Sequence, residues 1–304
     1  MTDPVALVAH SHGLDLAGSL WLPDQPAVAL VVMHPGSGPS DRDNDVLFPP
    51  IRAALLARRI AVASFDKRGV GGSEGSWLEA GVGDQADDLL AGVAAARAHV
   101  DGIPVGLFGH SQGGWVVLEA VRRAGSSGLA FAVTSSGPAV PMGVQERYAT
   151  HRASGRLGVP QDDAVRIDAA TDGMFALAER GATYEELLAW ADDPALADDI
   201  ALVTRTFGDA LPSRPAWDLA VRLAAFDPKV ALRAVHLPLL AVFGADDEVV
   251  PVDVSAVALH EAVDPEWLTV AVLPGGGHRM SPPGDTAFVD GYPSVVVDFV
   301  ANQA

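Results

Sequence analysis

The sequence predicts an α/β protein with one mostly parallel sheet of eight strands and helices on both of its faces. Short runs rich in β-branched residues alternate with longer amphipathic stretches rich in alanine and leucine. That alternation is typical of strand–helix units around a parallel sheet. The chain has 304 residues, 49% of them hydrophobic, which is enough to bury a large core in one domain that carries an insertion.

The expected strands follow one another along the chain except in its middle. They are Val5–His10, Leu14–Leu22, Ala27–His34, Ile60–Phe65, Val105–Gly109, Ala130–Ser135, Leu239–Gly244 and Leu268–Leu273. Only Ser11–His12–Gly13 separates the first two, which is too short for a crossover helix, so they are expected to form an N-terminal antiparallel hairpin. Helices are expected at Val46–Arg58, Asp84–Val100, Gln112–Ala124, Val252–Ala262 and Tyr292–Ala301.

The alternation of strands and helices stops between residues 138 and 226. This segment has helical periodicity and no convincing strand. Its expected helices are Val144–Ser154, Asp162–Arg180, Tyr184–Asp192 and Ala195–Asp209. We therefore expect a core formed by residues 1–137 and 227–304, interrupted by a helical cap, or lid, at residues 138–226. Most aromatic residues of the cap are expected to pack its helices, and a minority to face a ligand.

Charge and composition exclude several classes of partner. The chain has 20 Lys+Arg against 39 Asp+Glu, a formal net charge of −19, so we expect neither nucleic acid nor an anionic membrane as a partner. It has no cysteine, which excludes disulfides, thiolate metal sites and cysteine nucleophiles. The Met1–His10 segment lacks the pattern of a signal peptide, and no apolar run reaches the roughly 18 residues of a membrane span. We expect a cytoplasmic protein, with a homodimer as the oligomer that base rates favour.

A nucleophilic serine is predicted directly after an apolar strand. Val105–Phe108 leads into Gly109–Gly114, which contains G-x-S-x-G centred on Ser111, and a helical pattern follows. Such a strand–turn–helix projects the serine hydroxyl from a sharp turn, and the two small residues relieve the crowding of the backbone. The beginning of the helix offers a free N–H, that of Gln112, where an oxyanion would develop.

The acid and the base are expected after the serine, because the chain order of this constellation is serine, acid, histidine. Of nine histidines, only His260 and His278 follow the candidate acid. His260 lies in a predicted helix, whereas His278 lies in a glycine-rich loop after the last strand and is the preferred base. The acid lies in Ala245–Pro251, where Asp247 is preferred and Asp246 is the alternative.

A second oxyanion donor is expected at the turn His34–Pro39, which follows a buried strand and is rich in glycine. We assign it to the Ser37 N–H. In the resulting mechanism His278 takes the proton of Ser111, the serine attacks an acyl carbonyl, and Asp247 fixes the tautomer of His278. No metal or organic cofactor is required.

The chain resembles the α/β-hydrolase superfamily, and within it the bacterial serine esterase and acyl-peptidase-like branch. Four blocks carry the resemblance, in the order of the family: His34–Asp43, Phe65–Ser73, Gly109–Gly114 and Gly244–Pro251. It implies the α/β-hydrolase fold, and its pattern G-x-x-D-x-x-V-P selects Asp247. Relatives usually read His-Gly in the first block, whereas Pro35 intervenes here, so Gly36 stands behind Ser37 as the oxyanion donor. The Asp66–Gly69 loop is expected to be structural.

The expected activity is that of a carboxylesterase acting on small or medium acyl or alcohol groups, with a small-molecule ester as partner. The same triad serves thioesterases, lactonases and peptidases, and these stay open as alternatives. A non-catalytic ligand-binding protein is an alternative of another class, disfavoured because every expected catalytic residue is present. Two interpretations exist for Arg147, Arg152 and Arg156: a basic patch near the pocket, or a solvated face of a helix. We favour the solvated face.

Overall fold

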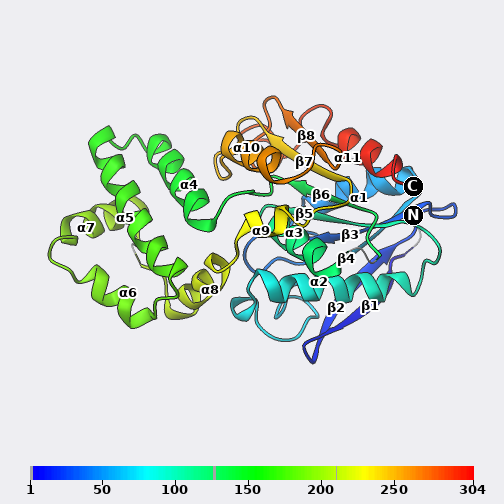
Figure 1. Ribbon diagram of the computed structural model, residues 1–304, viewed down its shortest axis with the longest axis horizontal. Coiled ribbons are helices and arrows are strands. Elements are labelled where there is room, and N and C mark those ends of the chain that lie inside the picture. Colours follow the sequence, from blue (N-terminus) through cyan, green and yellow to red (C-terminus); the bar gives the residue numbers. More distant parts are fainter. Residues whose placement is uncertain (1–2, 126–127, 210) are drawn as a thin grey trace.

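The computed structural model describes residues 3–125, 128–209 and 211–304, which form one eight-stranded sheet with helices around it (Figure 1). The strand order is β1-β2-β4-β3-β5-β6-β7-β8. The strands are β1 Val5–Ser11, β2 Leu14–Trp21, β3 Ala29–His34, β4 Ile60–Phe65, β5 Val105–His110, β6 Phe131–Ser135, β7 Leu239–Gly244 and β8 Leu268–Leu273. β1 pairs antiparallel with β2 and β2 antiparallel with β4, and all other pairs are parallel. The predicted fold class is therefore confirmed.

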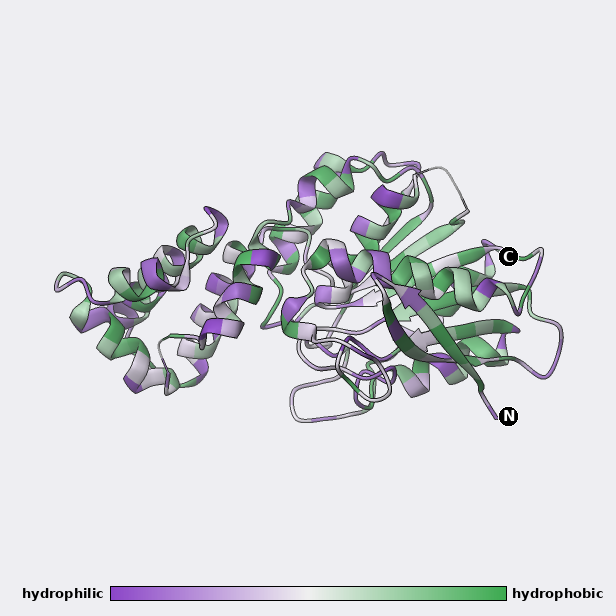
Figure 2. Ribbon diagram, turned by 90° about the horizontal axis from the view of Figure 1, so that it is seen from below, coloured by the Kyte–Doolittle hydropathy of each residue, from purple (hydrophilic) through white to green (hydrophobic). Residues whose placement is uncertain are grey.

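The centre of the sheet is buried on both faces because helices cover each of them. Residues of β3 alternate between two clusters: Leu30 and Val32 belong to one, and Val31 and Met33 to the other. This alternation follows from the period of two in a strand. The first cluster includes side chains of α2 Val82–Arg97, α3 Gln112–Ala124, α9 Pro228–Leu232 and α10 Val252–Ala262, and the second those of α1 Phe48–Ala57 and α11 Tyr292–Ala301. Figure 2 shows hydrophobic colouring concentrated in the strands.

The order of the strands creates a switch point between β3 and β5. The chain leaves β3 to form β4 on one side and returns to form β5 on the other. The carboxyl ends of the two strands are adjacent, with His34 paired to Gly109. Loops diverge at such a point and leave a crevice where open α/β sheets bind ligands. The segment after His34 and the turn after Gly109 therefore meet there.

In the described residues, helices α4 to α8, which lie between β6 and β7, form the helical insertion. They are α4 Met142–Arg156, α5 Gln161–Glu179, α6 Tyr184–Ala191, α7 Ala197–Phe207 and α8 Arg214–Ala224. Figure 1 shows α5, α6 and α7 projecting away from the sheet. The insertion has a small core of its own, in which Trp217 and Leu187 are fully buried against Phe175.

The structure adds three elements to those predicted: α8, α9 and a short 3-10 helix η1, Trp77–Glu79. Both α8 and α9 have proline in the first turn, where a helix needs no N–H donor, so the proline does not prevent the helix. No helix in the described ranges is long and apolar enough to cross a membrane.

Candidate active site

Ser111 lies at the turn between β5 and α3 in a strained backbone conformation. Its φ is 55° and its ψ −126°, a region that favours glycine and that other residues occupy only when the surroundings enforce it. Two backbone hydrogen bonds hold the turn: Ser111 N donates to Ser135 O over 2.9 Å, and Gly114 N donates to Ser111 O over 2.8 Å. The hydroxyl is thereby presented at the carboxyl edge of the sheet.

The two glycines of the motif are required by close backbone contacts. A Cβ atom on Gly109 would lie 2.0 Å from Gly113 O, and one on Gly113 would lie 2.6 Å from His34 O and 2.8 Å from Pro35 O. These distances are far below van der Waals contact. Gly109 therefore lets the elbow turn tightly against its own backbone, and Gly113 lets it approach the end of β3.

His278 connects Ser111 to Asp247. Its Nε2 atom lies 2.9 Å from Ser111 Oγ, and its Nδ1 atom lies 3.0 Å from Asp247 Oδ2 and 3.1 Å from Oδ1. The tautomer with the proton on Nδ1 donates to the carboxylate and leaves Nε2 free to accept from the serine hydroxyl. The predicted serine, histidine and acid thus form one line of hydrogen bonds.

Asp247 rather than Asp246 is the carboxylate at His278. The Asp247 side chain is fully buried, and its Oδ1 accepts hydrogen bonds from Val249 N (2.8 Å) and Val250 N (2.9 Å). Asp246 is exposed. His260, the other candidate base, is exposed on α10.

The loop that carries His278 lies over the end of β7. A Cβ atom on Gly244 would lie 2.2 Å from Gly276 O and 2.5 Å from Gly277 O, so the backbone of the loop occupies the space of the missing side chain. Asp246 N donates to Gly276 O over 2.8 Å. These contacts fix His278 above the loop that carries Asp247.

The predicted oxyanion donors, Ser37 and Gln112, lie on two segments that meet near Ser111. Gln112 is the first residue of α3, where the helix provides no acceptor for the N–H. Ser37 and Gly36 line the cleft at Ser111, and a Cβ on Gly36 would lie 3.3 Å from that of Ser111. No hydrogen bond inside the described ranges uses the N–H of Ser37.

A cleft of about 300 Å³ opens at Ser111 and His278. Its other lining residues are Gly36, Ser37, Asn44, His110, Gln145, Glu146, Val249 and Arg279. Val249 is the only large apolar side chain among them, so most of the residues that line the cleft are polar. Helix α4 of the insertion contributes Gln145 and Glu146.

His110 and Glu146 line this cleft and have shifted pKa values. Burial, and then the proximity of His278 and Arg279, hold the pKa of His110 well below its usual value, and its ring centroid lies 5.2 Å from that of His278. His110 therefore stays neutral beside the predicted base. Burial raises the pKa of Glu146, whose Oε1 accepts a hydrogen bond from Gln145 Nε2 over 3.3 Å.

Solved structures with the same arrangement of elements support the fold. An esterase of Pyrococcus furiosus is 17% identical, with a TM-score of 0.63 over 99% of this chain and 91% of the other. A proline iminopeptidase of Mycobacterium smegmatis is 17% identical, with a TM-score of 0.61 over 98% of each chain. A monoacylglycerol lipase of Paleococcus ferrophilus is 17% identical, with a TM-score of 0.60 over 95% of this chain and 99% of the other.

The chain has the α/β-hydrolase fold. Residues 25–158, fewer than half of the chain, match the family model of serine aminopeptidases, S33. No curated protein matches the sequence significantly. The matched residues include the end of β3, the elbow at Ser111 and the beginning of the insertion.

Several residues at the candidate site were not singled out from the sequence. Gln145 and Glu146 belong to an ordinary helical pattern, so only the placement of α4 shows that they line the cleft. The three arginines of the same helix face acidic partners instead: Arg147 pairs with Asp172, and Arg152 and Arg156 pair with Glu248. About half of each arginine side chain is exposed, and none lines the cleft.

The described residues include no group of three or more His, Asp or Glu placed to hold a metal ion.

The helical insertion contacts the candidate site directly. The Tyr148 hydroxyl of α4 donates to the backbone carbonyl of Asp247 over 2.8 Å. The acid loop and the first helix of the insertion are therefore held together.

Proposed function

We propose that this α/β-hydrolase is a serine hydrolase that cleaves carboxylic esters with small to medium acyl or alcohol groups through an acyl-enzyme on Ser111. The main support is the line of hydrogen bonds from Ser111 through His278 to Asp247. A serine hydroxyl is a weak nucleophile by itself, and a base within hydrogen-bond distance, oriented by a carboxylate, activates it.

Acylation begins when Ser111 Oγ attacks the ester carbonyl carbon and gives its proton to His278 Nε2. The carbonyl electron pair moves to oxygen and forms an oxyanion, which the N–H groups of Ser37 and Gln112 stabilise. The carbonyl then re-forms, the bond to the alcohol oxygen breaks, and that oxygen takes the proton from His278. The buried Asp247 stabilises the imidazolium that exists between these two transfers.

Deacylation repeats the same steps with water. His278 takes a proton from water, the hydroxide oxygen attacks the acyl carbon, and a second oxyanion forms at the same N–H groups. Its collapse breaks the bond to Ser111 Oγ, which recovers its proton from His278. The carboxylic acid leaves, and the free enzyme is restored.

The size of the cleft supports a substrate with a short acyl or alcohol group. A volume of about 300 Å³ is at the lower end of the range for small-molecule sites. Two of the similar structures are described as an esterase and a monoacylglycerol lipase. We propose that helix α4, which supplies Gln145 and Glu146, acts as the wall of a cap over the substrate.

The test is release of p-nitrophenol from acetate, butyrate and octanoate esters by the wild type, Ser111→Ala and His278→Ala. Turnover by the wild type, with a loss of about 10³-fold or more in each variant, supports the proposal, and we expect acetate and butyrate to be better substrates than octanoate. A fluorophosphonate should label the wild type at Ser111 only. A folded wild type that neither hydrolyses esters nor reacts with the fluorophosphonate would contradict the proposal and favour a binding protein.

A second candidate function is removal of an N-terminal amino acid from a peptide. Glu146 supports it, because a carboxylate in the wall of the cleft suits a substrate ammonium group. No lysine or arginine in the described ranges forms an ion pair with Glu146. The similar structure of a proline iminopeptidase and the matched serine aminopeptidase family agree with it.

Aminoacyl p-nitroanilides with a free and an acetylated N-terminus distinguish the two candidates. The aminopeptidase candidate predicts cleavage of the free form alone, with KM raised by about tenfold or more in Glu146→Gln, because one charge-assisted contact is lost. Hydrolysis of esters without cleavage of either anilide would leave the esterase proposal standing alone.

A further inference from the structure

Lys67 lies buried behind the two segments that flank Ser111. It follows β4 at the second position after the strand, and 7% of the residue is exposed. Its Nζ donates to the backbone carbonyl of Gly36 and, over 3.2 Å, to Gln112 Oε1. One ammonium group thus contacts the loop after β3 and the first residue of α3.

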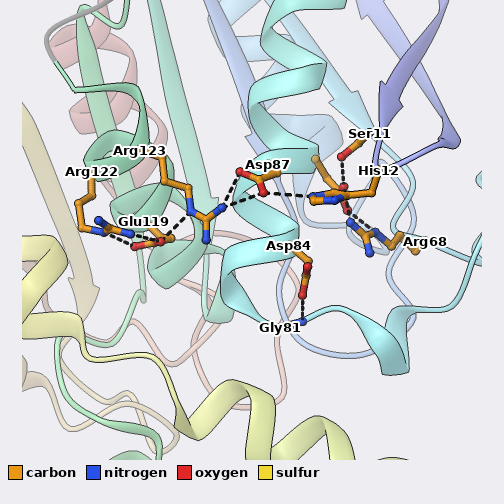
Figure 3. A network of polar contacts seen from close by, with 10 residues as sticks. Ser11, His12, Arg68, Gly81, Asp84, Asp87, Glu119, Arg122 and Arg123 are labelled. Atoms are coloured by element: carbon orange, nitrogen blue, oxygen red, sulfur yellow. Dashed lines mark hydrogen bonds and ion pairs between the residues drawn. The ribbon is translucent and has the colours of Figure 1, made fainter.

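No carboxylate in the described part of the chain forms an ion pair with Lys67. The acidic residue beside it is already occupied, because Asp66 accepts hydrogen bonds from Arg42. The next residue, Arg68, and Ser11 both contact the Asp88 carboxylate of α2 (Figure 3). A buried ammonium without a counter-ion is costly, so a lysine here is unexpected for a loop that only braces the sheet.

The contact with Gly36 determines the direction of the Ser37 N–H. The Gly36 carbonyl and the Ser37 N–H belong to the same peptide unit, which is planar and trans. In such a unit the C=O and N–H bonds point in opposite directions. With the carbonyl held by Lys67, the N–H points away from the ammonium, and both Gly36 and Ser37 line the cleft.

The contact with Gln112 acts on the other donor. Gln112 contributes its backbone N–H at the beginning of α3, and its side chain oxygen is held by Lys67. The ammonium also polarises the Gly36–Ser37 peptide, because a positive charge at the carbonyl oxygen strengthens the N–H as a donor. The hold on Gln112 and the polarisation of the Gly36–Ser37 peptide both favour stabilisation of the negative charge that develops in the transition state.

We propose that Lys67 is the positioning residue of the oxyanion hole, which holds the Gly36–Ser37 peptide and Gln112 so that both N–H groups face the reacting carbonyl oxygen. This inference rests on the proposed serine hydrolase function. It replaces the expectation that the Asp66–Gly69 loop is structural alone.

The charge of Lys67 gives the inference a pH dependence. Burial lowers the pKa of Lys67 to about 7, so the ammonium loses its proton as the pH rises through about 7. Of the charged or titratable groups around it, Asp66 is paired with Arg42 and Arg68 with Asp88. Burial, and then the Lys67 charge, lower the pKa of His34 to about 3, so His34 stays neutral.

The test compares Lys67→Met and Lys67→Gln with the wild type, and uses Lys229→Met as the matched control, because Lys229 is the other lysine of the chain and is exposed. At pH 6 we expect Lys67→Met to lower kcat by about 10- to 100-fold. This decrease is no larger than that caused by removing a direct oxyanion donor. KM should change by less than about threefold. Lys67→Gln keeps a donor without the charge and should lie between. Lys229→Met should equal the wild type.

Two further readouts separate positioning from a merely structural role. A boronic acid that forms a tetrahedral adduct with Ser111 should lose affinity in parallel with kcat/KM, because it mimics the transition state. We expect the kcat/KM of the wild type to decline above about pH 7, because Lys67 loses its charge. This decline should be absent in both Lys67 variants.

A folded Lys67→Met with wild-type kcat and boronate affinity overturns the inference while leaving the proposed function intact. An unchanged pH profile in an active Lys67→Gln overturns it as well, even where Lys67→Met fails to fold. Absence of any turnover by the wild type overturns the proposed function and the role of Lys67 with it.

Discussion

The Nε2 atom of His278 lies 2.9 Å from the Oγ atom of Ser111, although 167 positions separate the two residues in the sequence. Their contact depends on the parallel sheet, which brings the ends of β5 and β8 to the same edge. It also depends on Gly244, whose missing side chain leaves room for the loop that carries His278.

The strain at Ser111 should be measurable as stability. Because its φ is 55°, glycine relieves strain that alanine retains, so Ser111→Gly should have a free energy of unfolding about 1 kcal/mol higher than Ser111→Ala. Urea unfolding of the two inactive variants measures the difference. Equal stabilities would show that the turn is not strained.

Asp247 and Asp246 offer a matched pair of adjacent carboxylates. Asp247→Asn should lower kcat by about 10² to 10⁴-fold, because the amide no longer holds His278 in the required tautomer. Asp246→Asn should change kcat by less than about twofold, since its side chain is exposed. Ester hydrolysis at saturating substrate measures both, and a larger loss in Asp246→Asn would reverse the assignment.

The close approach of α3 to the loop after β3 should make Gly113 intolerant of alanine. The new Cβ would lie 2.6 Å from His34 O, which would force the elbow away from the loop after β3. We expect Gly113→Ala to lower kcat/KM by about 10²-fold, a loss comparable with that of an oxyanion donor. Gly155→Ala is the control, because Gly155 lies in α4 with no atom within 4 Å of the new Cβ. That variant should keep full activity and gain roughly 0.5 to 1 kcal/mol in stability.

Stability should fall in mild acid because His34 is buried and neutral. Its pKa is lowered to about 3, first by burial and then by the Lys67 charge. In the unfolded chain the histidine binds a proton near its ordinary pKa of about 6.5. Its contribution is therefore complete above about pH 6.5 and is lost as the pH falls toward 3, by up to about 1.4 kcal/mol per pH unit.

The substitution His34→Gln isolates this contribution. Urea unfolding at pH 7, 6 and 5 should show the free energy of unfolding of the wild type falling more steeply than that of the variant. Parallel curves for the two proteins would mean that His34 does not titrate differently on unfolding.

Local sequence was sufficient for most of the fold. The bounds of β4, β7, β8, α3, α10 and α11 agree with the prediction, because each is a short periodic run with a clear break at both ends. The sequence also predicted Ser111, Asp247 and His278 as one constellation, since the chemistry requires particular residue types at fixed places along alternating strands. The structure brings their side chains together, and their catalytic role stays a prediction.

Tertiary structure decided which distant groups share the site. Glu146 belongs to a helix whose periodicity does not distinguish a cleft-lining carboxylate from a solvated one, and only the docking of α4 through Tyr148 and Asp247 places it beside Ser111. Lys67 lies in a motif for which the sequence predicts a structural loop. Its contacts with Gly36 and Gln112 exist only because β4, β3 and β5 are neighbours in the sheet. Steric and hydrogen-bonding rules within a few residues specify a turn, whereas the partners of a buried charge depend on which strands the folded sheet brings together.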